Sequence, residues 1–176
     1  MVGLFFVASA VPRWRVPDPQ YDLLFTVDLG YDPAGPRVMT SVVVRDGRVE
    51  ADIRAAAPNT HPTRSSLYLF DHVSGDVRDV PFDAPPTLPE GDEVLTVAIP
   101  ALAGRKVIAG NRAPDGYEFE VRNSSAPGLV GELFGMRRYG QDAVIKRGGR
   151  VIPLEVPGGS VFATRAIGWL GAGDGR

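Results

Sequence analysis

The stretch RVMTSVVVRDGRVEADI, Arg37–Ile53, predicts how this chain begins to fold. Two runs rich in β-branched residues flank the dipeptide Asp46-Gly47. A two-residue hairpin turn needs positive φ at both central positions, and Asp-Gly is one of the pairs that adopt this conformation readily. We therefore expect an antiparallel hairpin whose strands cover about Arg37–Val44 and Val49–Ile53.

Turn signals of the same kind recur along the chain. Ser74–Asp76 separates the runs SSLYLF and VRDVPF, Gly148-Gly149 lies inside AVIKRGGRVIPLEVP, and Pro114–Gly116 precedes YEFEVRN. In the last run Tyr117 and Phe119 alternate with charged residues, which is typical of a strand with one buried face. Further strands are predicted in VLTVAIP and VFATRAIGWL.

The run Tyr21–Leu29 also alternates. Its apolar residues fall mainly on one face, whereas Asp22, Thr26 and Asp28 fall on the other, with Leu24 as an exception. This pattern predicts a half-buried strand, packed against a core on one face and solvated on the other.

About ten short strands with turns between them predict one all-β domain over residues 21–176. We expect an antiparallel, sandwich-like arrangement, with a small propeller-like or open-barrel arrangement as the alternative. Leucine, valine and phenylalanine recur at helical spacing in GLVGELFGMRRYG, Gly128–Gly140, but two glycines interrupt them. This segment predicts one short helix or a glycine-rich flap.

Residues 1–20 differ from the rest. Val2–Val11 carries no charge, and Trp14 lies between two arginines before the proline-rich sequence VPDPQ. Ten residues span about 15 Å as a helix, against about 30 Å of bilayer hydrocarbon. We interpret the segment as a truncated anchor or signal remnant followed by a linker, which places the domain at the cell membrane on its periplasmic or extracytoplasmic side. The alternative is a buried first strand of a cytoplasmic protein.

Two resemblances support parts of this interpretation. The order PQYDLLF, DGYEFE, GELFG and GWL resembles a group of uncharacterised bacterial proteins with an N-terminal membrane segment. That resemblance implies a membrane anchor and a C-terminal all-β domain, and it implies no activity. LYLFDHVSGDVRDVPF and RAPDGYEFEV more weakly resemble hairpins of β-propeller blades.

The chemistry available to the chain is limited. It has two histidines, His61 and His72, and no cysteine, so we predict no catalytic site, no cofactor and no metal site. His72 lies among Asp71, Asp76 and Asp79, but their spacing does not match a calcium loop. Aspartate and serine often bond nearby backbone groups in turns, so a polar hairpin turn is the preferred interpretation.

One group of basic residues could form an anion-binding or partner-binding surface. The alternative is that these charges protect a sheet edge from pairing. The group consists of Arg137, Arg138, Tyr139, Lys146, Arg147 and Arg150.

Together these observations predict a non-enzymatic binding module, tethered to a membrane or exported, whose partner is an envelope protein. A formal net charge of −2 gives no reason to expect nucleic acid. Two alternatives stay open. The first is a hydrolase-type enzyme that uses carboxylates; the second is a cytoplasmic scaffold or sensor whose edge strand accepts a peptide.

Overall fold

The computed structural model describes residues 16–31, 37–57, 63–82, 91–123, 141–157 and 163–171. Among these residues the regular elements are strands and one short 3₁₀ helix, η1 (Pro100–Leu102). The prediction of an all-β antiparallel fold is confirmed, and the strands form no closed barrel. The predicted helix or flap at Gly128–Gly140, the apolar run Val2–Val11 and His61 lie outside the described residues.

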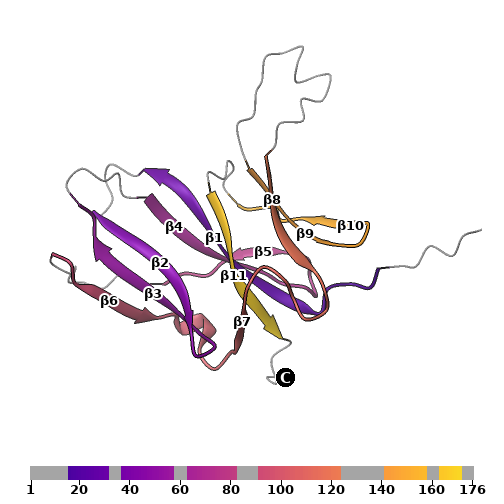
Figure 1. Ribbon diagram of the computed structural model, residues 1–176, viewed down its shortest axis with the longest axis horizontal. Coiled ribbons are helices and arrows are strands. Elements are labelled where there is room, and N and C mark those ends of the chain that lie inside the picture. The colour runs from indigo at the N-terminus through magenta and orange to yellow at the C-terminus, as the bar shows by residue number, and fades with distance from the viewer. Residues whose placement is uncertain are drawn as a thin grey trace, which may run out of the picture.

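The strands form three sheets (Figure 1). The central sheet has the order β5 (Val77–Asp79), β4 (Thr63–Phe70), β1 (Tyr21–Tyr31), β11 (Ala163–Gly171) and β7 (Val107–Ala109). The β2-β3-β6 sheet contains β2 (Val38–Arg45), β3 (Arg48–Ala55) and β6 (Val94–Ala98). The β8-β9-β10 sheet contains β8 (Glu118–Asn123), β9 (Gln141–Arg147) and β10 (Arg150–Pro153).

The central sheet is covered on both faces. One face packs with the β8-β9-β10 sheet and the residues around it, in a core of Leu23, Phe25, Val27, Tyr68, Phe70, Trp169, Ala113, Tyr117, Phe119, Ala143, Ile145 and Leu154. The other face packs with the β2-β3-β6 sheet and η1, in a core of Leu24, Leu67, Leu69, Ile167, Leu170, Val107, Val42, Val49, Val80, Ile99 and Leu102. The domain is therefore a sandwich of three layers.

This arrangement corrects the prediction that Tyr21–Leu29 is half-buried. Leu24, the apparent exception, belongs to the second core, and Asp22 and Thr26 are also buried, each 7% exposed. Thr26 donates its hydroxyl hydrogen to the carbonyl oxygen of Arg165, at 3.5 Å. Asp22 and Thr26 thus lie under a second layer rather than in solvent.

A β-bulge in β11 sets which side chains reach each core. Leu24 pairs with Gly168 and Phe25 with Ala166, so Ile167 is the extra residue. An inserted residue shifts the alternation of side chains by one position. Ile167 consequently joins the second core, whereas Ala166 packs against the first.

The first hairpin is confirmed. Asp46 has φ 51° and Gly47 has φ 73°, and the flanking strands pair in register from Arg45–Arg48 to Val38–Ala55. The turn also contacts the central sheet, because the amide of Val107 donates to the carbonyl oxygen of Gly47 at 2.9 Å. The hairpin end therefore links the second layer to β7.

We expect Gly47→Val to lower the free energy of unfolding by about 1–3 kcal/mol, because a β-branched residue is strained at positive φ. An added Cβ would lie 3.8 Å from the carbonyl oxygen of Val107, so crowding is not the cause. Gly149→Val is the matched control, since that turn position has open space and no positive φ. Equal losses of stability in urea unfolding would contradict this account of the turn.

The other predicted turns are also confirmed. The chain reverses between β4 and β5 and between β9 and β10, and Gly116 has φ 92° before β8. Tyr117 is fully buried and Phe119 is 7% exposed, as the alternation in YEFEVRN predicts.

Residues 16–20, predicted to be a linker, pack against the turns of the β8-β9-β10 sheet. Val16 is partly buried against the first core. Four polar contacts hold the segment: Tyr117 Oη to Pro17 O (2.8 Å), Gln20 N to Asp115 Oδ2 (2.8 Å), Arg150 Nη1 to Val16 O (3.2 Å) and Arg150 Nη2 to Asp18 Oδ1 (2.5 Å). These five residues are fixed to the domain and are not a free spacer.

Candidate functional site

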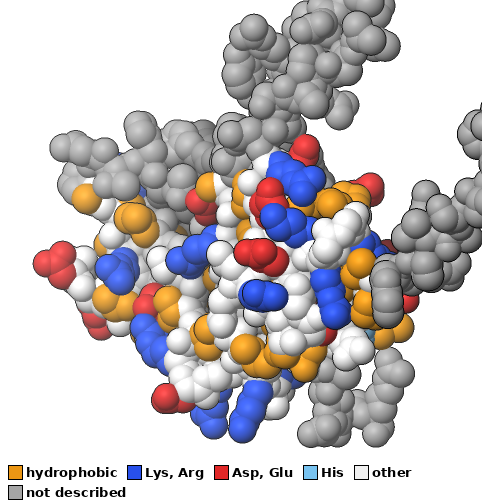
Figure 2. Space-filling model, turned by 45° about the vertical axis from the view of Figure 1, so that its right-hand side comes forward, with side chains coloured by type: hydrophobic (Ala, Val, Ile, Leu, Met, Phe, Trp, Pro, Cys, Tyr) orange, Lys and Arg blue, Asp and Glu red, His pale blue; other side chains and the backbone are white. Residues whose placement is uncertain are grey.

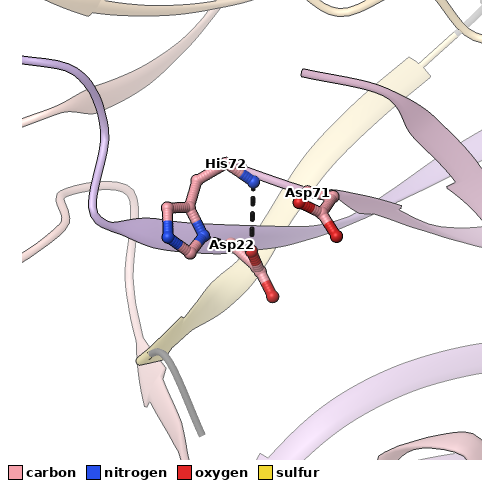
Figure 3. A group of neighbouring side chains, drawn as sticks. All are labelled: Asp22, Asp71 and His72. Carbon is pink, nitrogen blue, oxygen red and sulfur yellow. Dashed lines mark hydrogen bonds and ion pairs between the residues drawn. The ribbon is translucent and has the colours of Figure 1, made fainter. Parts of the chain in front are cut away.

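A buried polar group that joins distant segments is centred on Asp22, near the start of β1. Its Oδ1 accepts a hydrogen bond from the His72 amide at 3.1 Å and lies 2.6 Å from His72 Nδ1. Figure 3 shows the imidazole ring beside this carboxylate, with its second ring nitrogen, Nε2, on the side away from Asp22. The carboxylate therefore fixes both the backbone and the ring of His72.

Arg105 completes the group from the other side. It follows η1 in the chain, and its Nη2 donates to Asp22 Oδ2 at 2.6 Å. Asp22 thus joins the start of β1, the β4–β5 turn and the segment that leads into β7. These residues are 50 and 83 positions apart in the sequence, so no local spacing could reveal the group.

Asp22 is held in its ionised form. Burial raises the pKa of its carboxyl group, but hydrogen bonds from Arg105 and His72 outweigh burial, and the resulting pKa lies below the ordinary value. A general acid needs the opposite shift, toward neutrality. The arrangement favours a structural ion pair over a proton donor.

Asp71 has a local role in the turn. Its Oδ1 accepts hydrogen bonds from the amides of Val73 (2.9 Å) and Ser74 (3.1 Å), and Ser74 Oγ accepts one from the Asp76 amide (3.2 Å). These are the side chain-to-backbone bonds expected of aspartate and serine in turns. The interpretation of this stretch as a polar hairpin turn is confirmed for these residues.

Asp22, Asp71 and His72 each present a potential metal ligand, and these atoms lie within 4.8 Å of one another (Figure 3). The donor set nevertheless fits a cation poorly. Both oxygens of Asp22 and Nδ1 of His72 are already engaged, and the Arg105 guanidinium lies where it would repel a metal ion. A metal bound through Asp22 and His72 Nδ1 would compete with the contacts that join these segments.

We expect Asp22→Asn to lower the free energy of unfolding at pH 7 by about 2 kcal/mol, because it removes a charged partner of Arg105 and His72. The pKa of Asp22 is lower in the folded state, so its contribution is present above the unfolded pKa of about 3.9 and disappears as pH falls below it. Urea unfolding between pH 3 and 7 should therefore show a shallower acid-side slope for the variant.

The control is Asp79→Asn, which removes the same charge from an exposed side chain on β5. If both variants unfold with the same free energy as the native sequence at pH 7, the Asp22 group does not hold the layers together.

A second polar network lies on the outer face of the β2-β3-β6 sheet. Asp52 is 4% exposed and receives Arg45 through two hydrogen bonds, at 2.9 and 2.7 Å. Thr96 donates its hydroxyl hydrogen to the same carboxylate at 3.0 Å, and Arg45 also reaches Glu50 at 3.1 Å. The hydrogen bonds from Arg45 hold the pKa of Asp52 below its ordinary value. The network links all three strands of this sheet.

The predicted basic surface is only partly described, because Arg137, Arg138 and Tyr139 lie outside the described residues. Lys146 is paired with Glu120, and Arg150 with Asp18. The guanidinium of Arg147 lies beside Gly116, whose added Cβ would be 3.6 Å from Arg147 Nε. On the face in Figure 2, positive and negative side chains are interspersed. Two of the three described basic residues, Lys146 and Arg150, are therefore engaged in ion pairs within the domain.

Edge strands offer a different kind of site. An edge carries unpaired backbone groups, and proteins usually protect them with short length, charge, proline or a covering segment. β5 and β7 have three residues each, and β10 ends in Pro153. The free side of β8 is covered at its start, since Phe119 N donates to Asn111 O at 2.8 Å.

The two edges of the β2-β3-β6 sheet differ from each other. On β2, Arg165 donates to the carbonyl oxygen of Val42 at 2.9 Å, so a side chain of the central sheet occupies one carbonyl of that edge strand. β6 has the sequence VLTVA, without charge or proline, and no strand in the described part of the chain pairs with its outer side. Leu95 and Val97 are half-buried, whereas Val94, Thr96 and Ala98 are exposed. β6 is the candidate interaction site.

Comparison with known proteins assigns the chain to no family, because no family model, no curated protein and no solved structure matches it. No helix in the described ranges is long and apolar enough to span a bilayer.

Proposed function

We propose that the chain is a non-enzymatic protein-interaction module, held at a membrane by its N-terminal segment, that offers the edge strand β6 to a partner. The observation that supports it is the outer edge of β6, which is five uncharged residues long and pairs with no strand among the described residues. Backbone amides and carbonyls on such an edge bind an extended segment by strand addition, and the side chains supply selectivity.

The surroundings of β6 suit this role. Asp52 and Thr96 anchor β6 to β3 through their side chains, at 3.0 Å, so the strand is held before a partner arrives. A pre-formed strand loses little conformational freedom on binding. A partner would find apolar surface to cover, because Val94 is exposed and Leu95 and Val97 are half-buried.

The interaction is tested by photo-crosslinking in cells. Benzoylphenylalanine at Ala98, on the exposed side of β6, is expected to give discrete adducts. The same probe at Ser41 is the control, because Ser41 is exposed on β2, the opposite edge of the same sheet, where Arg165 occupies the Val42 carbonyl. Identical adduct patterns at both positions, or none at Ala98, would refute β6 as the binding edge.

The tether is tested by fractionation of the protein expressed from its native locus. We expect it to stay in carbonate-washed membranes and to be digested by protease added to intact spheroplasts. Recovery of the intact protein in the cytosol would refute the tether, and the cytoplasmic scaffold would replace it.

A further inference from the structure

We infer that the segment that pairs with β6 is β6 of a second copy of this chain, related to the first by a two-fold axis. The inference rests on the proposed function, because it assigns a partner to the same edge. Its basis is the self-complementary sequence of β6, VLTVA.

The fold restricts the possible register. Residues that pair across two strands lie on the same face of a sheet, and successive residues alternate between faces. A two-fold axis normal to the sheet must therefore pass between one residue and the same residue of the second copy. Thr96 is the centre that pairs all five residues of β6, placing Leu95 opposite Val97 and Val94 opposite Ala98.

The resulting pairs are compatible on both faces. Leu95 and Val97 are half-buried on the inner face, and each would cover the other copy's apolar side chain. On the outer face, Thr96 opposes Thr96, a favourable cross-strand pair. The acidic residues Asp92 and Glu93 precede the strand and would lie opposite Pro100 and Ile99, so like charges are not brought together.

Pairing at this edge would join two sheets of three strands into one continuous sheet. β3 holds each β6 by the antiparallel register Glu50–Ala98 to Arg54–Val94, and the partner would add on the other side. On β2, the other edge of this sheet, Arg165 already occupies the carbonyl oxygen of Val42. A two-fold contact uses the β6 edge of both copies, so this contact by itself closes at two copies.

The chain contains no cysteine, so one introduced thiol reports the register directly. Thr96→Cys should form a disulfide-linked dimer under mild oxidation, because two directly opposed Cβ atoms in an antiparallel pair lie close enough for a disulfide. Val94→Cys places the thiols at opposite ends of the pair, and Ser41→Cys lies in the same cross-strand row as Thr96 but on β2. We expect the dimer yield of Thr96→Cys to exceed both controls by at least about tenfold.

The unmodified chain gives a second test. Sedimentation equilibrium should show a dimer that Thr96→Lys dissociates, because two ammonium groups would oppose each other at the axis. Thr96→Lys also removes the hydrogen bond from Thr96 to Asp52. Thr96→Val removes the same hydrogen bond without adding a charge, and Ser41→Lys adds the same charge on β2. Both controls should stay dimeric.

The outcomes separate the two proposals. A monomer at every concentration, or equal disulfide yields at all three positions, overturns self-pairing. If Ala98 still crosslinks to a different protein in cells, the interaction module stands and its partner is another chain. If Ala98 gives no adduct either, both proposals fail.

Discussion

Trp169→Ala is expected to lower the free energy of unfolding by about 3–5 kcal/mol, the range for truncation of a large aromatic side chain in a core. Trp169 is fully buried in β11, opposite Leu23 of β1 and Ile108 of β7. It packs in the core between the central sheet and the β8-β9-β10 sheet, together with Tyr117 and Phe119. Its loss would leave a cavity between two layers.

Trp169→Phe is the matched variant. Phenylalanine keeps an aromatic ring and removes the indole Nε1, which is buried and has no hydrogen-bond partner among the described residues. The smaller cavity and the removal of an unsatisfied donor should limit the loss to about 1–2 kcal/mol. Urea unfolding followed by circular dichroism measures both variants. A loss below about 1 kcal/mol for Trp169→Ala would contradict the placement of Trp169 in the core between the central sheet and the β8-β9-β10 sheet.

Gly168→Ala is expected to cost about 3 kcal/mol, at the upper end of overpacking effects. An added Cβ would lie 2.5 Å from Val107 Cγ1 and 2.6 Å from the carbonyl oxygen of Ile108. The second contact is with backbone, so β7 itself would have to move away from β11. The second core would then open where Val107 packs.

Gly171→Ala is the control for this variant, since it lies in the same strand and its added Cβ would be 3.6 Å from a ring carbon of Tyr21, an ordinary contact. We expect little change in its melting temperature. Equal melting temperatures for the two alanine variants would show that β7 does not approach β11 closely at Gly168.

Turn chemistry made much of the fold predictable. Asp46-Gly47 and Gly148-Gly149 close hairpins where the sequence places them, because positive φ is a local demand that few residues meet. Once these turns are placed, the strands on either side of them can be predicted. The number of layers was not predictable in this way, since it depends on which sheets pack together.

The strand β1 illustrates the difference. Its alternation predicts one buried face, yet Leu24 and Thr26 are buried as well as Leu23 and Phe25. The signal in the sequence was Leu24, an apolar residue on the nominally polar face. A threonine buried by a hydrogen bond to backbone cannot be distinguished from a solvated one by pattern alone.

For the polar groups too, local contacts were predictable from the sequence and contacts between distant segments were not. The contacts of Asp71 with Val73 and Ser74 are local, and the sequence predicted their kind. The contacts of Asp22 with His72 and Arg105 join distant segments, and only the packing of the layers brings them together. Of the predicted basic surface, Lys146 and Arg150 have acidic partners that could not be assigned before the strand order was known.

The central claim is that β6 has an open edge, whereas the central sheet is covered on both faces. Amide hydrogen exchange of the dilute purified chain tests this claim most directly. The amides of Leu23–Val27 should exchange only on global unfolding, as expected for the middle of a three-layer core. In β6, alternate amides should be protected by β3 while those between them exchange at nearly unprotected rates. Uniform slow exchange across Val94–Ala98, at a concentration where the chain sediments as a monomer, would mean that another part of the chain already covers this edge. The proposed interaction would then be wrong.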